Sequence, residues 1–586
     1  MVETKELTDL GNEEARTFLL HPSSYCNFSM PPYINLKGFL QAGQEWITET
    51  PVFDSSYYSS LTPKQKKKFY QTIGRCPDLN YLIRMNKDGR YAWRPLTLVH
   101  PYAYATLVIE LTEHNNWEKL KTRFNTLYSE TQNHVIVASK PRVALSKDSD
   151  SEDLLYKTST KENISNWWDH FEQETVRQSI IYPFLAGTDI ANFYSSIYTH
   201  SIAWAIEGRD NAKANHSLIL LGNRIDALFQ ALNAGETIGI PQGNACSDII
   251  AEIILANIDS QVIQAANNEK GIKDFKILRY RDDYRIMTKT RADAEIILQL
   301  LVDILAVYNL SLNSQKTWLS DDVISSAVKP EKLDFRRSFL IGRPVRAMSS
   351  DNARTVGEAI DKAITENSVL QETYYFQESL ENITQSPDFL PQISEILSKS
   401  ITETNLRDFL FYIREFAKSF PNSGSLQIAL ELYKKTIKSK PTLVKDVRLH
   451  IAIILDIVSS NPRCLVNGIA IFSLFLEKMP TELKSETVQQ ILDYFQTIPN
   501  VEYVRIWLQR IALGLHLNTS WDSKLCALVE SPTNGPLWGT SFLSTDDINS
   551  ESDKFTKIPL VDECVVQELS DIMSDHEYSP FSKYGS

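Results

Sequence analysis

The sequence predicts two kinds of fold in one chain, an α+β unit followed by an all-α unit built from successive helices. Short apolar runs alternate with amphipathic helical segments up to about residue 320. Beyond about residue 350 the strand signals fade, and apolar stripes at helical spacing take over. With 586 residues the chain is too long for one hydrophobic core, because single cores stop growing at roughly 250 to 300 residues. We therefore expect two or three domains.

Composition narrows the class of protein. The hydrophobic fraction of 43% and the charged fraction of 23% are those of an ordinary globular protein. A formal charge of −13 argues against a surface that coats itself non-specifically in nucleic acid, so a nucleic-acid channel must be local. The six cysteines show no zinc-ligand spacing, and neither an apolar signal segment nor a run of about 18 uncharged apolar residues is present. We expect a reduced, cytoplasmic protein without structural zinc or a membrane span.

Residues 1–75 form a leading segment that is rich in Tyr, Pro and Ser and ends in the lysine run Lys64–Lys68. Such a run can contact phosphates, but four lysines near a helix start are more often a solvated face, and we favour that interpretation.

Residues 76–320 carry the α+β pattern, and their most informative stretch is Lys276–Met287. Two β-rich runs flank a polar turn, which predicts a hairpin with Asp282 and Asp283 at its tip. Adjacent carboxylates repel each other, so a divalent cation between them is the functional interpretation. Asp-Asp is also common in turns that have no function, so a companion carboxylate is needed.

Asp189 is that companion. It ends the apolar run Ala186–Asp189 and is followed by an aromatic helix start, so we expect it at the end of a strand. Three carboxylates from two elements can hold two Mg²⁺ ions about 4 Å apart, one activating a 3′-hydroxyl and the other holding a triphosphate. This is the chemistry of phosphoryl transfer.

Two further stretches flank these acids. Between them, the Gly/Pro turn Ile238–Ser247 leads into an apolar helix over 249–258, and small residues such as Gly243 permit close approach of a base or ribose. A helix is predicted over 292–308. After it, Lys316 follows a strand-like run and is a candidate acid or charge neutraliser near the pyrophosphate.

The rest of the chain divides into three parts. A connector over 321–350 carries Arg336, Arg337, Arg343 and Arg346, which fit either a product exit path or plain surface charge. Over 351–540, helices start roughly every 20 residues and helix pairs every 40, close to the HEAT-type period; an irregular bundle fits as well as a solenoid. Residues 541–586 hold ten acidic residues against three lysines, and we expect a mobile acidic tail.

The order D-x-x-x-F-Y, G-x-P-Q-G, Y-x-D-D and L-x-L-N-x-x-K-T resembles motifs A to D of reverse transcriptases. The resemblance covers 76–320 and implies the fingers and palm of a right-hand polymerase, with Asp189, Asp282 and Asp283 as metal ligands for two Mg²⁺ ions. It further implies that Ile190 lends its backbone carbonyl to a metal and that Gln242 touches the incoming nucleotide. Tyr194 would be the steric gate against a 2′-hydroxyl, so dNTPs would be preferred.

Each of the finer roles has a plainer alternative. Tyr194 is also explained as a core tyrosine, and Gln242 as part of a helix-capping turn. Arg94-Pro95 resembles the fingers segment of these enzymes, so Arg94 is the candidate triphosphate contact, with Lys140 and Arg142 as alternatives.

The run Phe193–Trp204 and the long helical C-terminal region resemble abortive-infection reverse transcriptases of the AbiK type. That resemblance implies a bacterial, cytoplasmic antiphage protein that forms homo-oligomers. It also implies template-independent DNA synthesis from a protein tyrosine, with the DNA product covalently attached. Tyr25, Tyr33, Tyr578 and Tyr584 are candidates for that tyrosine. The alternatives are templated reverse transcription of a bound non-coding RNA, and a non-catalytic module that senses a phage protein.

Overall fold

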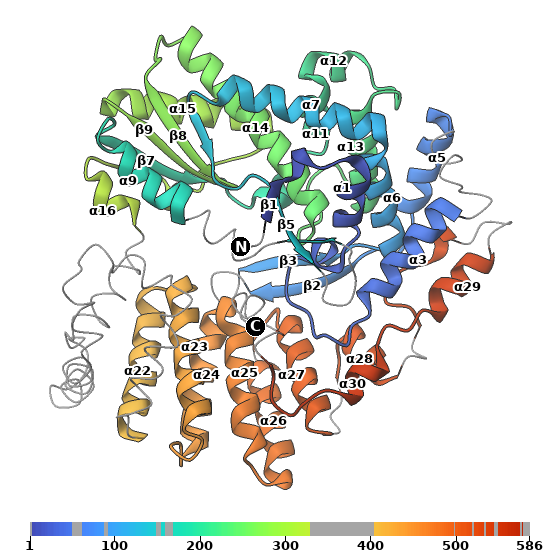
Figure 1. The fold of residues 1–586 in the computed structure, drawn as a ribbon, viewed down its shortest axis with the longest axis vertical. Coiled ribbons are helices and arrows are strands. Elements are labelled where there is room, and N and C mark those ends of the chain that lie inside the picture. Colours follow the sequence, from blue (N-terminus) through green and yellow to red (C-terminus); the bar gives the residue numbers. More distant parts are fainter. Residues whose placement is uncertain are drawn as a thin grey trace.

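Figure 1 shows the computed structural model of the chain, in which a part of mixed helix and sheet stands above a row of helices. The structure describes residues 3–49, 61–86, 92–147, 154–158, 168–328, 403–496, 498–517, 521–531, 535–543, 549–574 and 577. The four arginines Arg336, Arg337, Arg343 and Arg346, which fit either a product exit path or plain surface charge, lie outside the described residues.

A five-stranded sheet with the order β10-β7-β9-β8-β4 organises the centre of the predicted α+β unit. All neighbouring strands are antiparallel except β4 and β8, which are parallel. The strands are β4 (Val135–Val137), β7 (Phe184–Asp189), β8 (Phe275–Tyr280), β9 (Asp283–Thr288) and β10 (Trp318–Ser320). The predicted hairpin is confirmed as β8 and β9, joined by Arg281 and Asp282. Arg281 takes a left-handed conformation with φ of 53° in this turn.

Two long helices support this sheet. Helix α15 (Arg291–Val307) packs on β7 and β9 and against α14 (Ala245–Asn268), and both include the segments predicted from apolar periodicity. Asn244 caps α14 by accepting a hydrogen bond from the Ser247 amide, and Thr290 caps α15 in the same way through Asp293. By length and composition alone α14 could cross a membrane, but 83% of its most apolar window is buried inside the protein, as in a core helix.

A buried ionic network fixes the hairpin to α14. The Arg279 guanidinium of β8 is fully buried and donates to Glu252 Oε1 and Asp259 Oδ2, both on α14, at 2.7 Å each. The Tyr284 hydroxyl of β9 donates to the second oxygen of Asp259 at 3.0 Å. Because every charge has a partner, burial is tolerated, and the hairpin is held in one position over the helix.

Residues before the sheet form helices and two small sheets of order β1-β5-β6 and β2-β3. Since β1 pairs with β5, the leading segment expected over 1–75 packs as part of the α+β unit. The strands here are β1 (Glu3–Glu6), β2 (Tyr81–Asn86), β3 (Trp93–Leu98), β5 (Arg142–Lys147) and β6 (Leu154–Thr158). The helices are η1 (Leu7–Asp9), α1 (Asn12–Leu19), α2 (Pro22–Tyr25), α3 (Leu36–Glu49), α5 (Pro63–Gly74), α6 (Pro101–Thr112), α7 (His114–Thr131), the π-helix η2 (Trp168–Gln173), α9 (Glu174–Gln178), α10 (Phe193–Ser196), α11 (His200–Glu207), α12 (Arg209–Ala214) and α13 (Leu221–Leu232).

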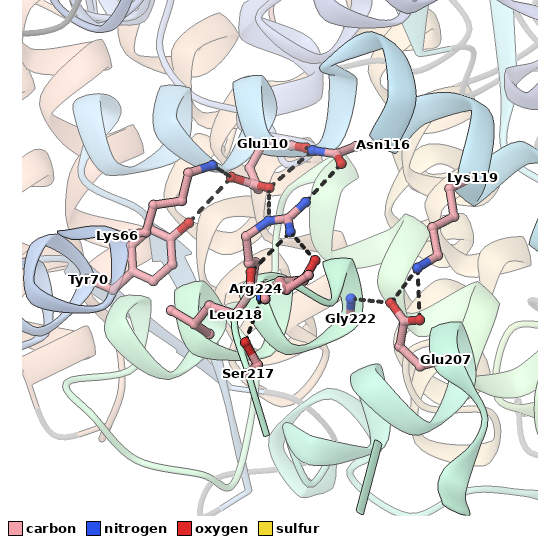
Figure 2. Close-up of polar contacts among 11 residues, drawn as sticks. Lys66, Tyr70, Glu110, Asn116, Lys119, Glu207, Ser217, Leu218, Gly222 and Arg224 are labelled. Carbon is pink, nitrogen blue, oxygen red and sulfur yellow. Dashed lines mark hydrogen bonds and ion pairs between the residues drawn. The ribbon is translucent and has the colours of Figure 1, made fainter. Parts of the chain in front are cut away.

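Figure 2 shows a second buried ionic network, which joins α5, α6, α7 and α13. The Glu110 carboxylate of α6 accepts from Lys66 Nζ at 2.9 Å, Arg224 Nε at 2.6 Å, Asn116 Nδ2 at 3.1 Å and the Tyr70 hydroxyl at 3.4 Å. The lysine run that we assigned to a solvated face is therefore mixed. Lys64, Lys67 and Lys68 are exposed, whereas Lys66 turns inward, because a buried carboxylate lies within its reach.

The helical part below consists of antiparallel helices that stand side by side in Figure 1. Helices two apart in sequence contact each other, as in α22–α24, α23–α25 and α25–α27, which gives two layers. This arrangement fits the predicted succession of helices, and its HEAT-like character stays a prediction. The helices are α22 (Glu403–Ser419), α23 (Gly424–Ser439), α24 (Val447–Ser460), η4 (Pro462–Cys464), α25 (Leu465–Glu477), α26 (Thr481–Gln496), α27 (Glu502–Gly514) and α28 (Lys524–Glu530).

The expectation of a mobile acidic tail does not hold for residues 549–574 and 577. Helices α29 (Asn549–Lys557) and α30 (Glu563–Gln567) follow η5 (Ser541–Leu543), and α29 packs on α3 and η5. Phe555 is buried and stacks on His100 at 4.6 Å between ring centroids, and Val561 forms a β-bridge with Ile34. In this strap (residues 549–574) Asp553, Asp562, Glu563 and Glu568 are exposed, while Phe555, Val561 and Met573 are buried and complete the core.

Candidate active site

The predicted acids meet at one edge of the five-stranded sheet. Asp189 is the last residue of β7 and lies directly opposite Asp283, the first residue of β9. The backbone continues the contact, since the Ile190 amide donates to the Asp282 carbonyl at 3.0 Å. Directly opposed residues of an antiparallel pair have Cβ atoms about 4.5–5.5 Å apart, on the same face of the sheet. Motif A and the hairpin tip are thus neighbours, as the sequence predicts.

The Asp189 carboxylate is 7% exposed, and its two oxygens differ. Oδ2 accepts from Lys316 Nζ at 2.6 Å, whereas Oδ1 is buried without a hydrogen-bond partner among the described residues. A buried acceptor without a donor costs about 1–3 kcal/mol, and more when it is charged. Proteins keep such an atom where a ligand completes it.

The neighbouring Asp282 is also electrostatically strained. Burial raises the pKa of its carboxyl above the ordinary value of 3.8, and repulsion from Asp189 adds to the rise. The backbone amide of Asp282 and the cations of Arg281 and Lys316 oppose it only in part. Two acids that are held together while one resists ionisation form a site that favours an added positive charge.

The donor set fits Mg²⁺, which takes oxygen ligands almost exclusively. Carboxylate oxygens of Asp189, Asp282 and Asp283 and the Ile190 carbonyl are such ligands, and Asp189 Oδ1 is free to accept. Within the described ranges, no group of three or more His, Cys, Asp or Glu side chains is arranged to hold a metal ion. Side chains of consecutive strand residues alternate in direction. Burial lowers the pKa of Arg285 to about 10, and the nearby charges of Glu172 and Asp283 oppose this shift only in part. The two-ion, three-carboxylate site stays a prediction.

Lys316 reaches the acids from the opposite side. It ends η3 (Ser314–Lys316), which Asn313 caps by accepting from the Gln315 amide, and the Asn313 amide donates to the Asp189 carbonyl at 2.9 Å. These bonds place the ammonium on Asp189 although its side chain is 56% exposed. An exposed cation on a carboxylate fits the predicted role as charge neutraliser.

Tyr194 lies in α10, directly after Asp189, and is 9% exposed. Its hydroxyl donates to Asp248 Oδ1 at 2.6 Å, and its carbonyl accepts from the Ile240 amide at 2.9 Å. Burial raises the pKa of Tyr194, and the Asp248 charge raises it further, so the phenol stays protonated as a donor. It is a packed tyrosine beside Asp282, and its role as a steric gate stays a prediction.

The predicted Gly/Pro turn is closed from two sides. The Gln242 carbonyl accepts from the Thr97 amide of β3 at 2.9 Å, and the Gly243 carbonyl accepts from the Asn27 amide at 2.9 Å. Gly243 has φ of 116°, and a Cβ there would come within 2.8 Å of the Phe28 ring. The space that the sequence assigned to a base or ribose is thus bordered by Phe28. Asn244, and not Gln242, caps α14.

The three basic residues proposed to contact the triphosphate, Arg94, Lys140 and Arg142, have different surroundings in the structure. Lys140 Nζ lies 3.3 Å from Glu6 and 4.6 Å from the Tyr128 ring centroid, so it is engaged away from the acids. Arg94 lies in β3, three residues before Thr97, and is partly exposed. The side chain of Arg142 lies outside the described residues. Contact of Arg94 with a triphosphate stays a prediction.

Sequence reasoning missed four residues at this site: Asn27, Phe28, Asp248 and Arg281. Asp248 could have been found, because it stands in the first turn of the helix that follows the Gly/Pro turn. Arg281 is the variable residue of Y-x-D-D. Nothing in the local sequence marks Asn27 or Phe28, which reach the site only through the fold.

Comparisons with known proteins agree with this geometry. Residues 143–335, about a third of the chain, match the family described as "Reverse transcriptase (RNA-dependent DNA polymerase)". The match includes all the predicted acids and Lys316. The chain therefore contains a reverse transcriptase domain of mixed helix and sheet.

No curated protein matches the chain. Among solved structures, a telomerase from Candida albicans in complex with a fragment of telomeric RNA aligns at 12% identity and a TM-score of 0.28, covering 76% of this chain and 69% of that one. The RNA-dependent RNA polymerase of bacteriophage phi12 aligns at 10% identity and a TM-score of 0.18, covering 77% and 86%. These TM-scores are too low to support any inference about shared fold or function.

Proposed function

We propose that this chain, which carries a nucleotidyltransferase domain of the RNA-directed DNA polymerase type, joins dNTPs into DNA at the sheet edge where Asp189 and Asp282 meet. The observation that carries the proposal is the pair of crowded carboxylates at this edge, with Asp189 Oδ1 buried and without a donor from the part of the chain that the structure describes. A structural ion pair would complete both oxygens. A binding site for cations leaves one of them open.

The reaction assigns a task to each group. A hydroxyl oxygen bonds to the α-phosphorus and loses its proton, while the bond from that phosphorus to the bridging oxygen breaks and releases pyrophosphate. Two Mg²⁺ ions bound to Asp189, Asp282, Asp283 and the Ile190 carbonyl would supply positive charge to the attacking hydroxyl and the triphosphate. Lys316, 2.6 Å from Asp189, neutralises charge on the leaving pyrophosphate.

Nucleotide binding falls to the residues around the Gly/Pro turn. Tyr194 leaves no room for a 2′-hydroxyl because it is packed and hydrogen-bonded. The turn of Gln242 and Gly243 holds the base and sugar, and Arg94 on the fingers strand contacts the phosphates. We infer a preference for dNTPs from the Tyr194 contact.

We further propose that synthesis is template-independent, starts from a tyrosine of the protein and serves antiphage defence in the bacterial cytoplasm, in a homo-oligomer. The net charge of −13 supports this, because a templated enzyme needs basic surface for a long duplex. Of the four candidate tyrosines, Tyr25 and Tyr33 are buried, and Tyr25 donates to the Val99 carbonyl. The other two candidates, Tyr578 and Tyr584, lie outside the described residues, and the chain holds 25 tyrosines in all.

The test incubates the purified full chain with labelled dNTPs and Mg²⁺, without template or primer. We expect label that stays on the protein after denaturation and is released by nuclease, with none in the Asp189→Asn variant. Phenylalanine at residues 578 and 584 together should abolish the attachment. Transfer without any protein-bound label would reject self-priming and leave the polymerase intact.

Two alternatives rest on separate observations. The family description supports templated synthesis on a bound non-coding RNA; a discrete co-purified RNA together with its complementary cDNA would establish it. The Lys316–Asp189 ion pair supports the alternative of a non-catalytic phage-sensing module. Lys316 occupies Asp189 Oδ2, an oxygen that a catalytic metal ion would need as a ligand. Antiphage protection that survives Asp282→Ala plus Asp283→Ala would favour that module.

A further inference from the structure

Three separate segments converge on the carboxylate of Asp248, in the first turn of α14. Oδ1 accepts from the Tyr194 hydroxyl at 2.6 Å. Oδ2 accepts from Arg281 Nη2 at 3.3 Å and from Asn27 Nδ2 at 3.2 Å. The first helical turn also favours a negative charge, because the free backbone amides there carry partial positive charge. Asp248 thus links helix α10, the hairpin tip and the N-terminal loop.

The Tyr194 ring depends on this bond for its position. A buried phenol needs an acceptor, and a bond to a charged oxygen is about twice as strong as one between neutral groups. Phe193 precedes it and packs in the same core with no such bond, so burial alone does not require a hydroxyl at this place. The hydroxyl of Tyr194 therefore serves to anchor the ring.

We propose that Asp248 is a specificity-determining positioning residue, which fixes Tyr194 so that the ring excludes a 2′-hydroxyl. This inference rests on the proposed dNTP polymerase function. A steric gate discriminates only while it cannot move aside for one extra oxygen atom. Without the Asp248 anchor the ring can shift, and ribonucleotides then enter.

Asp248 also forms an ion pair with Arg281, which gives it a second role near the acids. Arg281 lies next to Asp282 in the hairpin turn and contributes to the pKa of that carboxyl, but its guanidinium pairs with Asp248. The pairing keeps a permanent cation from settling on Asp282. Loss of Asp248 could therefore also weaken the reaction for every nucleotide, and the test must separate the two effects.

The test compares dCTP with CTP, both as Kd by calorimetry and as kcat/KM for incorporation, on the full chain. Tyr194→Phe keeps the ring and removes the donor, and Asp248→Asn keeps the shape and removes the charge. Each should lower the preference for dCTP about tenfold or more, chiefly by admitting CTP. The double variant should lose no more than either single one, because both act through one bond.

Matched variants check the cause. Asp248→Glu should recover part of the preference. Asp293→Asn removes a first-turn carboxylate from α15, where it is bonded only within its own cap to Thr290, and should leave the preference unchanged. Thermal unfolding confirms that each variant is folded.

The results decide the inference and the proposed function separately. Folded Asp248→Asn protein with an unchanged dCTP-to-CTP ratio overturns the inference, and so does an equal loss for both nucleotides, which would assign Asp248 to Arg281 alone. Wild-type protein that binds dCTP without incorporating it overturns the polymerase proposal, and the binding ratio then still decides the role of Asp248.

Discussion

Two buried acids in this protein have opposite surroundings, and the difference separates a structural charge from a chemical one. Glu110 has a donor for each oxygen, from Lys66, Arg224, Asn116 and Tyr70 (Figure 2). Asp189 has Lys316 on one oxygen and, among the described residues, no hydrogen-bond donor on the other. Both lie in the same α+β unit, so burial alone does not tell them apart. The two acids differ in whether both carboxylate oxygens have a hydrogen-bond donor among the described residues.

The pKa directions follow the same division. For Glu110, burial would raise the pKa, but the charges of Lys66 and Arg224 outweigh burial and hold it below 4.5. For Asp282, burial and repulsion from Asp189 outweigh the opposing effects of its backbone amide, Arg281 and Lys316, so its pKa rises above 3.8. The cluster around Glu110 stabilises the ionised carboxylate, whereas the surroundings of Asp282 disfavour ionisation.

The largest expected effect is on catalysis. Asp282→Asn should lower nucleotide transfer on the order of 10⁴-fold, as expected when a group that holds transition-state charge is lost. The same change should not lower the free energy of unfolding, because it removes repulsion from Asp189. Single-turnover kinetics and urea titration measure both. Near-normal transfer would remove Asp282 from the chemistry.

Next in size is a loss of stability at the closed cluster. Glu110→Gln should lower the free energy of unfolding by about 3–5 kcal/mol, because Lys66 and Arg224 are left buried without their counter-charge. Transfer per folded molecule should stay unchanged. The control is Glu118→Gln, whose partner Lys121 is on the surface of the same helix, with an expected change below about 1 kcal/mol.

A smaller effect is expected from metal ions. Mg²⁺ at ten times its Kd should stabilise the wild-type protein by about 1.4 kcal/mol in the absence of nucleotide, because it binds the folded state alone. Asp189→Asn should lose this stabilisation, whereas Glu110→Gln should keep it. Thermal scans with Mg²⁺ and with EDTA provide the comparison, and equal shifts in both variants would point to binding elsewhere.

The smallest expected effect is a dependence on acid. The folded pKa of Glu110 lies below its ordinary 4.5, so its contribution to stability is complete above about pH 4.5 and is lost as the pH falls through the folded value. The stability difference between wild type and Glu110→Gln should therefore shrink in acid. Urea titrations between about pH 3 and 6 test it, and a constant difference contradicts the sign.

Local sequence pattern was sufficient to predict those functional residues that lie at the end of a strand, in a hairpin turn or at the start of a helix. The end of β7 at Asp189, the hairpin under Asp282 and the helix after the Gly/Pro turn all follow from short-range signals, and each is confirmed. Contacts between distant residues were not accessible. Lys66 looked like one of four surface lysines, because its partner Glu110 lies 44 positions away in the chain.

The site shows the same limit. Phe28 borders Gly243 through a contact that spans most of the domain sequence, and no periodicity encodes it. The acidic composition of 541–586 suggested a free tail, whereas the sparse apolar residues Phe555, Val561 and Met573 decide its packing. Composition averages over residues, but a few buried side chains can fix a segment.

The packing of the strap also sets an order of events during synthesis. Ile34 pairs with Val561, and the indole of Trp538 donates to the Leu98 carbonyl at 3.0 Å, so early and late parts of the chain complete one another. During synthesis on the ribosome, Ile34 and Leu98 emerge long before Val561 and Trp538. The α+β unit can therefore complete its packing only after the helical part and the strap have also been synthesised.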